Sequence, residues 1–160
     1  MSASTKNKTT ITAEPGKQEL FITREFDAPR ELVFKAHTDP SLYVQWLGPR
    51  GYEMKLETFE PVSGGRYRYI HKDNDGNEFG FHGVFHEISE ELMIQTFEFE
   101  GAPDMVNLDF LTFEDLGGRT RLRGRSICPN TQARDALLAS GMEDGMREGY
   151  QRLETVLKAL

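Results

Sequence analysis

Histidine side chains that could bind a metal or a ligand occur in a segment that alternates like a β-strand. His82 and His86 are four residues apart. Four residues of a strand span roughly 13 Å, so these two imidazoles cannot share one ion at Zn–N bonds of about 2.1 Å. The spacing therefore predicts no metal site. His82 remains a candidate polar group of a ligand pocket, with a surface or structural histidine as the alternative.

Carboxylates on the expected strands are the candidates for acid–base chemistry. If one of them faces an apolar interior, burial raises its pKa and makes it an acid or a base; otherwise it belongs to a solvated outer face. A bulge in any strand reverses which side chains point inward, so the pattern leaves both alternatives open. The carboxylates concerned are Glu57, Glu78, Glu87, Glu98 and Asp109.

Four arginines alternate along the last expected strand. Arg119, Arg121, Arg123 and Arg125 share one face, and Leu122, Gly124 and Ser126 share the other. Asp109 or other carboxylates on the adjacent strand could form cross-strand pairs with these arginines. An anionic ligand or partner is the alternative occupant of the row.

The chain has one cysteine, Cys128, so it forms no intramolecular disulfide. No histidine flanks Cys128, and we interpret it as a passive packed thiol. No glycine-rich phosphate loop, nucleophile elbow or cysteine-based zinc motif occurs, since Gly64-Gly65 and Gly117-Gly118 are typical of hairpin turns. The sequence therefore predicts no cofactor.

The elements that position these residues follow a simple order. One strand is followed by two short helices that begin near Pro29 and Asp39, then six strands separated by turn residues, and a helix after Pro129. Consecutive hairpins predict an antiparallel sheet, and a sheet of seven strands twists and curls. The expected strands are 18–26, 52–60, 66–72, 78–88, 92–99, 105–113 and 119–127.

The last helix carries one broad apolar face. Its apolar residues recur at steps of three and four, which predicts a helix that lies across the concave side of the sheet. Ser140-Gly141 either kinks this helix or marks the place where the long helix begins. We interpret residues 1–17 as a flexible tail and residues 18–160 as a single α+β domain.

The charge and the hydropathy of the chain exclude some classes of binding partner. The net charge of −7 argues against binding to nucleic acid, which requires clustered Lys and Arg. No signal peptide and no apolar stretch of about 20 residues occurs, so we expect no membrane insertion and a cytoplasmic protein. Edge strands of such a sheet could support a homodimer.

Several phrases along the chain resemble the activator of heat-shock protein 90 ATPase-like family of the START-like (SRPBCC) superfamily. The resemblance covers roughly residues 18–160 and is specific for the fold and family. The phrases are Phe26-Asp27-Ala28-Pro29-Arg30-Glu31-Leu32-Val33-Phe34-Lys35-Ala36, Asp39-Pro40, Trp46-Leu47-Gly48-Pro49, Gly64-Gly65-Arg66-Tyr67, His82-Gly83-Val84-Phe85-His86-Glu87-Ile88 and Gly118-Arg119-Thr120-Arg121-Leu122.

The resemblance implies a helix-grip (START-like, birch-pollen-allergen-like) fold, with a cavity between a curved seven-stranded sheet and the C-terminal helix. The leading hypothesis is a binding module for a small hydrophobic molecule. A cyclase- or hydrolase-type enzyme that uses the same pocket, and a co-chaperone-like protein-interaction module, are the alternatives. The residue types point to these ligand-binding candidates: Trp46, Tyr67, Tyr69, Phe81, His82, Phe97, Met142, Met146 and Tyr150.

Overall fold

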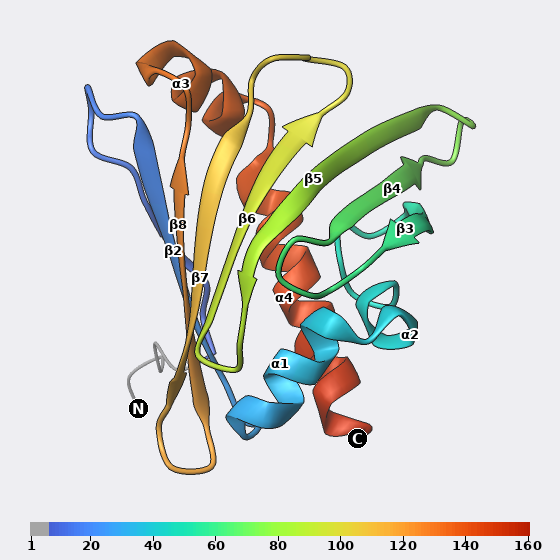
Figure 1. Ribbon diagram of the computed structural model, residues 1–160, viewed down its shortest axis with the longest axis vertical. Coiled ribbons are helices and arrows are strands. Elements are labelled where there is room, and N and C mark those ends of the chain that lie inside the picture. The colour runs from blue at the N-terminus through green and yellow to red at the C-terminus, as the bar shows by residue number, and fades with distance from the viewer. Residues whose placement is uncertain (1–6) are drawn as a thin grey trace.

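One antiparallel sheet curls around a long helix in the computed structural model, which describes residues 7–160 (Figure 1). The sheet has eight strands in the spatial order β1-β2-β8-β7-β6-β5-β4-β3. The strands are β1 (Thr10–Thr12), β2 (Glu19–Phe26), β3 (Glu53–Phe59), β4 (Arg66–Lys72), β5 (Glu78–Ile88), β6 (Leu92–Phe99), β7 (Asn107–Asp115) and β8 (Thr120–Ile127). The helices are α1 (Arg30–Thr38), α2 (Pro40–Tyr43), α3 (Thr131–Ala139) and α4 (Met142–Lys158).

The α+β class, the antiparallel sheet and the long C-terminal helix confirm the sequence prediction, but the strand number does not. Strand β1 pairs with β2 in the register Thr10 to Thr23, so the sheet gains an eighth strand at its edge. The sequence pattern places residues 10–12 in the flexible tail, within a segment rich in Ser, Thr, Lys and Asn. Hydrogen bonds to β2 order them instead. Residues 1–6 of that tail lie outside the described residues.

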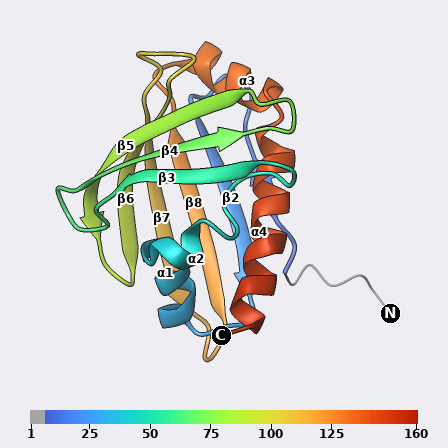
Figure 2. The same cartoon turned by 90° about the vertical axis from the view of Figure 1, so that its right-hand side faces the viewer.

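The two short helices begin where the sequence predicts. Helix α1 starts directly after Pro29, and Asp39 caps α2 by accepting a hydrogen bond from the backbone N–H of Ser41 at 2.9 Å. Pro40 follows at the first helical position, where a missing N–H costs little. Both helices lie over one end of the sheet beside α4 (Figure 2).

The C-terminal helical region breaks at Gly141, as Ser140-Gly141 suggests. Gly141 has a φ of 86°, a left-handed value that favours glycine. Helix α4 then runs along the concave face of the sheet (Figure 1), with Tyr150, Leu153 and Leu157 buried against it. An ion pair between Arg24 on β2 and Glu154 on α4, at 3.2 Å, joins the helix to the sheet.

The predicted cavity is the part of the fold that the structure does not show. Within residues 7–160, the two best-formed depressions have volumes of about 350 and 460 Å3, and neither lies between the sheet and α4. One borders Arg125 and Thr131 and the other borders Arg68 and Glu100. Large aromatic side chains fill the concave face instead, among them Phe26, Trp46, Tyr67, Phe85, Phe113 and Tyr150.

Candidate functional site

The inner face of β7 and β8 brings a carboxyl group into the interior. Asp109 alternates with Leu111 and Phe113 on this face of β7, and Ser126 lies opposite it on β8. The Ser126 hydroxyl donates a hydrogen bond to Asp109 Oδ1 at 2.6 Å. No register shift occurs between these two strands, so Asp109 stays on the same face as Leu111 and Phe113.

Burial changes the chemistry of this carboxyl group. It raises the pKa of Asp109 to about 6, against the lowering effect of the Ser126 hydrogen bond. The Asp109 side chain nevertheless keeps some accessible surface, as do Leu111 beside it and Gly124 opposite. In the described chain, Ser126 is the one hydrogen-bond partner of this carboxyl group, and its second oxygen has none.

Three buried tyrosines surround the same part of the interior. Tyr43 on α2, Tyr69 on β4 and Tyr150 on α4 are each at most 9% exposed. Burial raises the pKa of each phenol, and the charge of Asp109 raises it further, so that carboxyl acts on all three phenols. We call these four residues, Tyr43, Tyr69, Asp109 and Tyr150, the phenol–carboxyl cluster.

The phenol hydroxyls of the cluster have no hydrogen-bond partner within residues 7–160. Buried polar groups are normally paired with protein or with ordered water. Two fully enclosed side-chain atoms of the described chain lack a partner, His71 Nε2 and Glu154 Oε2, and no phenol oxygen is among them. The three hydroxyls therefore border a space that a water molecule can enter, and their hydrogen bonds are available to something outside the chain.

Tyr67 lies on the same face, and its phenol hydroxyl does have a hydrogen-bond partner. Its hydroxyl donates to the carbonyl of Thr96 on β6 at 2.6 Å, so the side chain crosses the intervening strand β5. Gly83 makes this crossing feasible, because a Cβ at that position would lie 2.7 Å from the Tyr67 hydroxyl. The Tyr67 ring therefore lines the interior, and its hydroxyl is not available to a ligand.

The structure gathers most of the predicted site residues on the inner face. Trp46, Tyr67, Tyr69 and Tyr150 are buried in the core, and the remaining apolar candidates pack against it with part of their surface exposed. These partly exposed residues come from β5, β6 and α4, and they are Phe81, Phe97, Met142 and Met146.

His82 is the exception. It follows Phe81 in β5, so strand alternation directs it to the outer face, where its side chain is 44% exposed. Its Nδ1 lies 2.9 Å from Glu100, and its Nε2 lies 3.6 Å from Glu98. His82 therefore belongs to an exposed network with Arg68, and the expectation that it joins the pocket residues is wrong.

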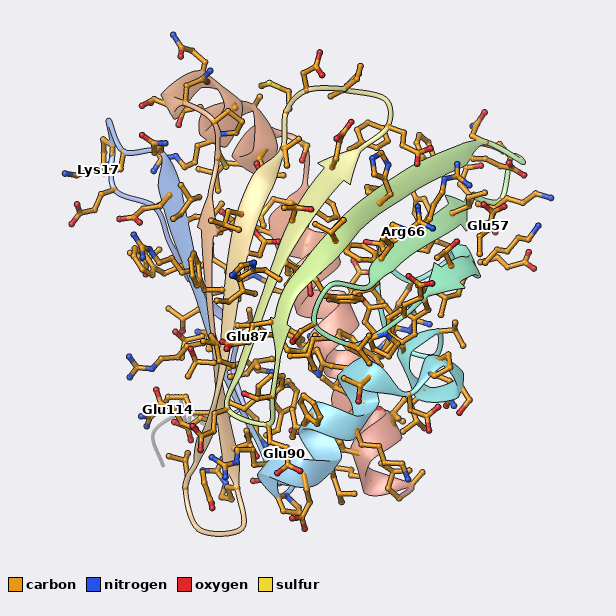
Figure 3. All side chains as sticks on the ribbon, in the orientation of Figure 1. Lys17, Glu57, Arg66, Glu87, Glu90 and Glu114 are labelled. Atoms are coloured by element: carbon orange, nitrogen blue, oxygen red, sulfur yellow. The ribbon has the colours of Figure 1, made fainter. Side chains whose placement is uncertain are left out.

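The arginine row of β8 also lies on the outer face. Glu25, Asp27, Glu114 and Glu19 pair with it at 2.7–3.3 Å, which confirms the interpretation as cross-strand ion pairs. Glu114 points away from the helices in Figure 3. Asp109 is not a partner of the row, because it lies on the opposite face of the sheet.

Sequence reasoning missed the roles of Tyr43 and Ser126 and left Asp109 undecided. The alternation of Leu122, Gly124 and Ser126 against the arginine row was the available signal, because it placed Ser126 on the face opposite the arginines. Tyr43 carried no such signal, since its place in a short helix after Asp39-Pro40 does not reveal which side faces the sheet.

Residues 7–160 contain neither a membrane-spanning helix nor a metal-binding cluster of side chains. Their helices are all too short or too polar to cross a membrane. Within the same residues, His, Cys, Asp and Glu side chains form no group of three or more that could hold a metal ion.

Comparison with known proteins places the chain by family and fold. Residues 27–158 match the family described as "Activator of Hsp90 ATPase homolog 1-like protein". A crystal structure of a protein from Rhodobacter sphaeroides is 30% identical, with a TM-score of 0.85 over 94% of this chain and 99% of that one. A solution structure from Arthrobacter aurescens is 26% identical, with a TM-score of 0.86 over 94% and 92% of the two chains.

A third solved structure is similar to this chain in fold alone. A crystal structure from Mycobacterium smegmatis is 21% identical, with a TM-score of 0.85 over 95% of this chain and 98% of that one. No curated protein matches the chain.

Proposed function

The chain belongs to the family of activator of Hsp90 ATPase homolog 1-like proteins, and from that premise we propose that it binds a small, mainly apolar molecule between the sheet and α4. The observation that carries the proposal is the phenol–carboxyl cluster. Its phenol hydroxyls and one carboxyl oxygen lack protein partners inside an aromatic interior. A pocket of this kind combines apolar walls with a few polar groups that orient the ligand.

Partly exposed apolar residues of α3 and α4 support entry of a ligand beside these helices. Met142 and Met146 on α4, and Leu137 and Leu138 on α3, are partly exposed and pack against the core. Methionine is unbranched and adapts its shape to a neighbour. We infer that a ligand displaces these side chains and the water beside the phenols, which accounts for a site without a large preformed cavity.

Gly124 offers a way to fill the proposed space. A Cβ at Gly124 would make ordinary contacts of 3.7–3.8 Å with Ile22 and Leu111, so a Cβ fits there without a clash. We expect Gly124→Val to abolish ligand binding and to leave the free energy of unfolding within about 1 kcal/mol of the wild-type value. Thr112→Val, on the outer face of β7, is the matched control and should leave binding unchanged.

The test combines native mass spectrometry of gently purified protein with fluorescence titration of N-phenyl-1-naphthylamine, a neutral apolar probe. The proposal predicts an extra mass that is lost on denaturation, or saturable probe binding, in the wild type and Thr112→Val but not in Gly124→Val. If no mass and no probe binds to the wild type, and Gly124→Val unfolds easily, the interior is a packed core and the proposal fails. The co-chaperone-like role and the homodimer stay predictions.

A further inference from the structure

The charge balance around Asp109 is unusual for a buried carboxyl group. Burial raises its pKa, and within residues 7–160 no cation acts in the opposite direction. Arg24, on the inner face of β2, is committed to Glu154 at 3.2 Å and to the carbonyl of Glu25 at 2.7 Å. A buried carboxylate without a paired cation is costly, because its hydration is lost without compensation.

The groups that face Asp109 are neutral near pH 7. Burial raises the pKa of Tyr43 on α2, of Tyr67 and Tyr69 on β4, and of Tyr150 on α4, so these phenols stay protonated. Burial also raises the pKa of the Cys128 thiol after β8. Gln95, opposite Asp109 on β6, and Ser126 on β8 do not titrate. The interior around Asp109 therefore offers one negative charge, hydrogen-bonding hydroxyls and aromatic faces.

We propose that the ligand is an apolar amine, whose ammonium group pairs with the free oxygen of Asp109 while its apolar body contacts the aromatic side chains. This inference rests on the ligand-binding function proposed above. An ammonium group supplies the missing counter-charge, can donate to the carboxylate and to phenol oxygens, and is attracted to aromatic faces. An anionic ligand would bring a second negative charge beside Asp109, and a neutral one would leave the carboxylate uncompensated.

Three naphthalene probes of nearly equal shape test the charge of the ligand: 2-naphthylmethylamine, 2-naphthylmethanol and 2-naphthoate. Their dissociation constants are measured by isothermal titration calorimetry at pH 7.5. We expect the amine to bind at least about tenfold more tightly than the alcohol and the carboxylate to bind weakest. In Asp109→Asn, which keeps the acceptor for Ser126, the amine should fall to the affinity of the alcohol, and the alcohol should be unaffected.

Glu114→Gln is the control for long-range charge. Glu114 lies on the same strand as Asp109 but on the outer face, where it pairs with Arg121 and Arg123. Its loss changes the net charge by the same amount as Asp109→Asn and should leave the preference for the amine intact.

The pH dependence of the wild type gives a second readout that needs no variant. With a pKa of about 6, Asp109 takes up a proton in the free protein as the pH falls from 7 to 5. Affinity for the amine should then fall by about tenfold, while that for the alcohol stays constant. His71, which lies on the inner face of β4, has its pKa lowered by burial to about 4 and stays neutral in this range.

The outcomes separate the two proposals. Equal affinity for amine and alcohol, or an amine preference that survives in Asp109→Asn, overturns the amine inference and leaves the ligand-binding function standing. If none of the three probes binds and purified protein carries no extra mass, both proposals fail.

Discussion

Two parts of the interior treat their buried polar groups in opposite ways. In the core under α1, buried donors have protein partners: the Trp46 indole N–H donates to the Ala36 carbonyl at 2.9 Å, and the Thr120 hydroxyl donates to the Ala28 carbonyl at 2.8 Å. His37 Nδ1 likewise donates to the Val33 carbonyl at 2.8 Å. In the phenol–carboxyl cluster, the three phenol hydroxyls have no partner in the described chain.

Packing follows the same division. Phe113 and Leu122 under α1 are each 1% exposed. Leu111 and Gly124 lie two residues away along the same strands, on the same face, and keep accessible surface. A core that served stability alone would gain by satisfying or replacing the unpaired groups, because each unmade hydrogen bond costs free energy. The contrast teaches that the α1 end maintains the fold, while the phenol–carboxyl end retains polar groups for a molecule outside the chain.

A matched pair of leucines tests the packing difference with the largest expected effect. Leu122→Ala removes a fully buried side chain and should lower the free energy of unfolding by about 3–5 kcal/mol. Leu111→Ala, on the neighbouring strand and partly exposed, should cost about 1–2 kcal/mol because less contact is lost. Urea unfolding followed by circular dichroism measures both. Equal losses would mean that the two ends are packed alike and would remove the contrast.

Asp109→Asn tests the electrostatic side of the comparison. The folded-state pKa of about 6 lies above the ordinary value of 3.8. Between these values the folded protein binds more protons than the unfolded chain, so this group lowers stability as the pH rises from 4 to 6. A pKa difference of about two corresponds to ~3 kcal/mol, and the partial exposure of Asp109 reduces the expected gain in Asp109→Asn at pH 7.5 to about 1–3 kcal/mol.

The control for this variant is its own behaviour at low pH. Near pH 3, below both pKa values, the carboxyl is mostly protonated in both states, so the variant and the wild type should unfold at similar urea concentrations. Burial lowers the pKa of His37 and of His71 to about 4, and both proteins therefore lose stability equally on acidification from pH 6.5. A pH-independent difference between the two proteins would show that Asp109 does not titrate in the interior.

The sequence predicts the helices and strands of the fold better than the candidate site, because the two depend on different kinds of pattern. Asp39-Pro40, the hairpin turns and the apolar face of the last helix are local signals, and each corresponds to an element of the structure. The inward direction of Asp109 is not local. Leu108 and Phe110 make the opposite face of β7 look equally apolar.

The structure resolves this ambiguity through neighbours on other strands. The Arg125 guanidinium covers the Phe110 ring at 5.8 Å, and Leu108 stays exposed, so the outer face tolerates both. Bulges shift the register between β3 and β4 and between β5 and β6, which alternation cannot predict. The predicted cavity came from the resemblance alone. Whether aromatic side chains fill such a space depends on packing between distant segments, and no local pattern reports it.

Single hydroxyl deletions test the contrast at its smallest scale. Thr120→Val removes the donor that satisfies the Ala28 carbonyl in a fully buried site, and should cost about 1–2 kcal/mol of unfolding free energy. Tyr69→Phe removes a hydroxyl that has no protein partner in the described chain, and should change stability by less than about 0.5 kcal/mol. Urea unfolding at pH 7.5 compares the two. If Tyr69→Phe costs as much as Thr120→Val, the phenol is paired within the folded chain and is not held for a ligand. If Tyr69→Phe is neutral for stability yet weakens binding of the naphthylmethylamine probe, the Tyr69 hydroxyl contacts the ligand. The contrast between the two parts of the interior then holds for a single hydroxyl group.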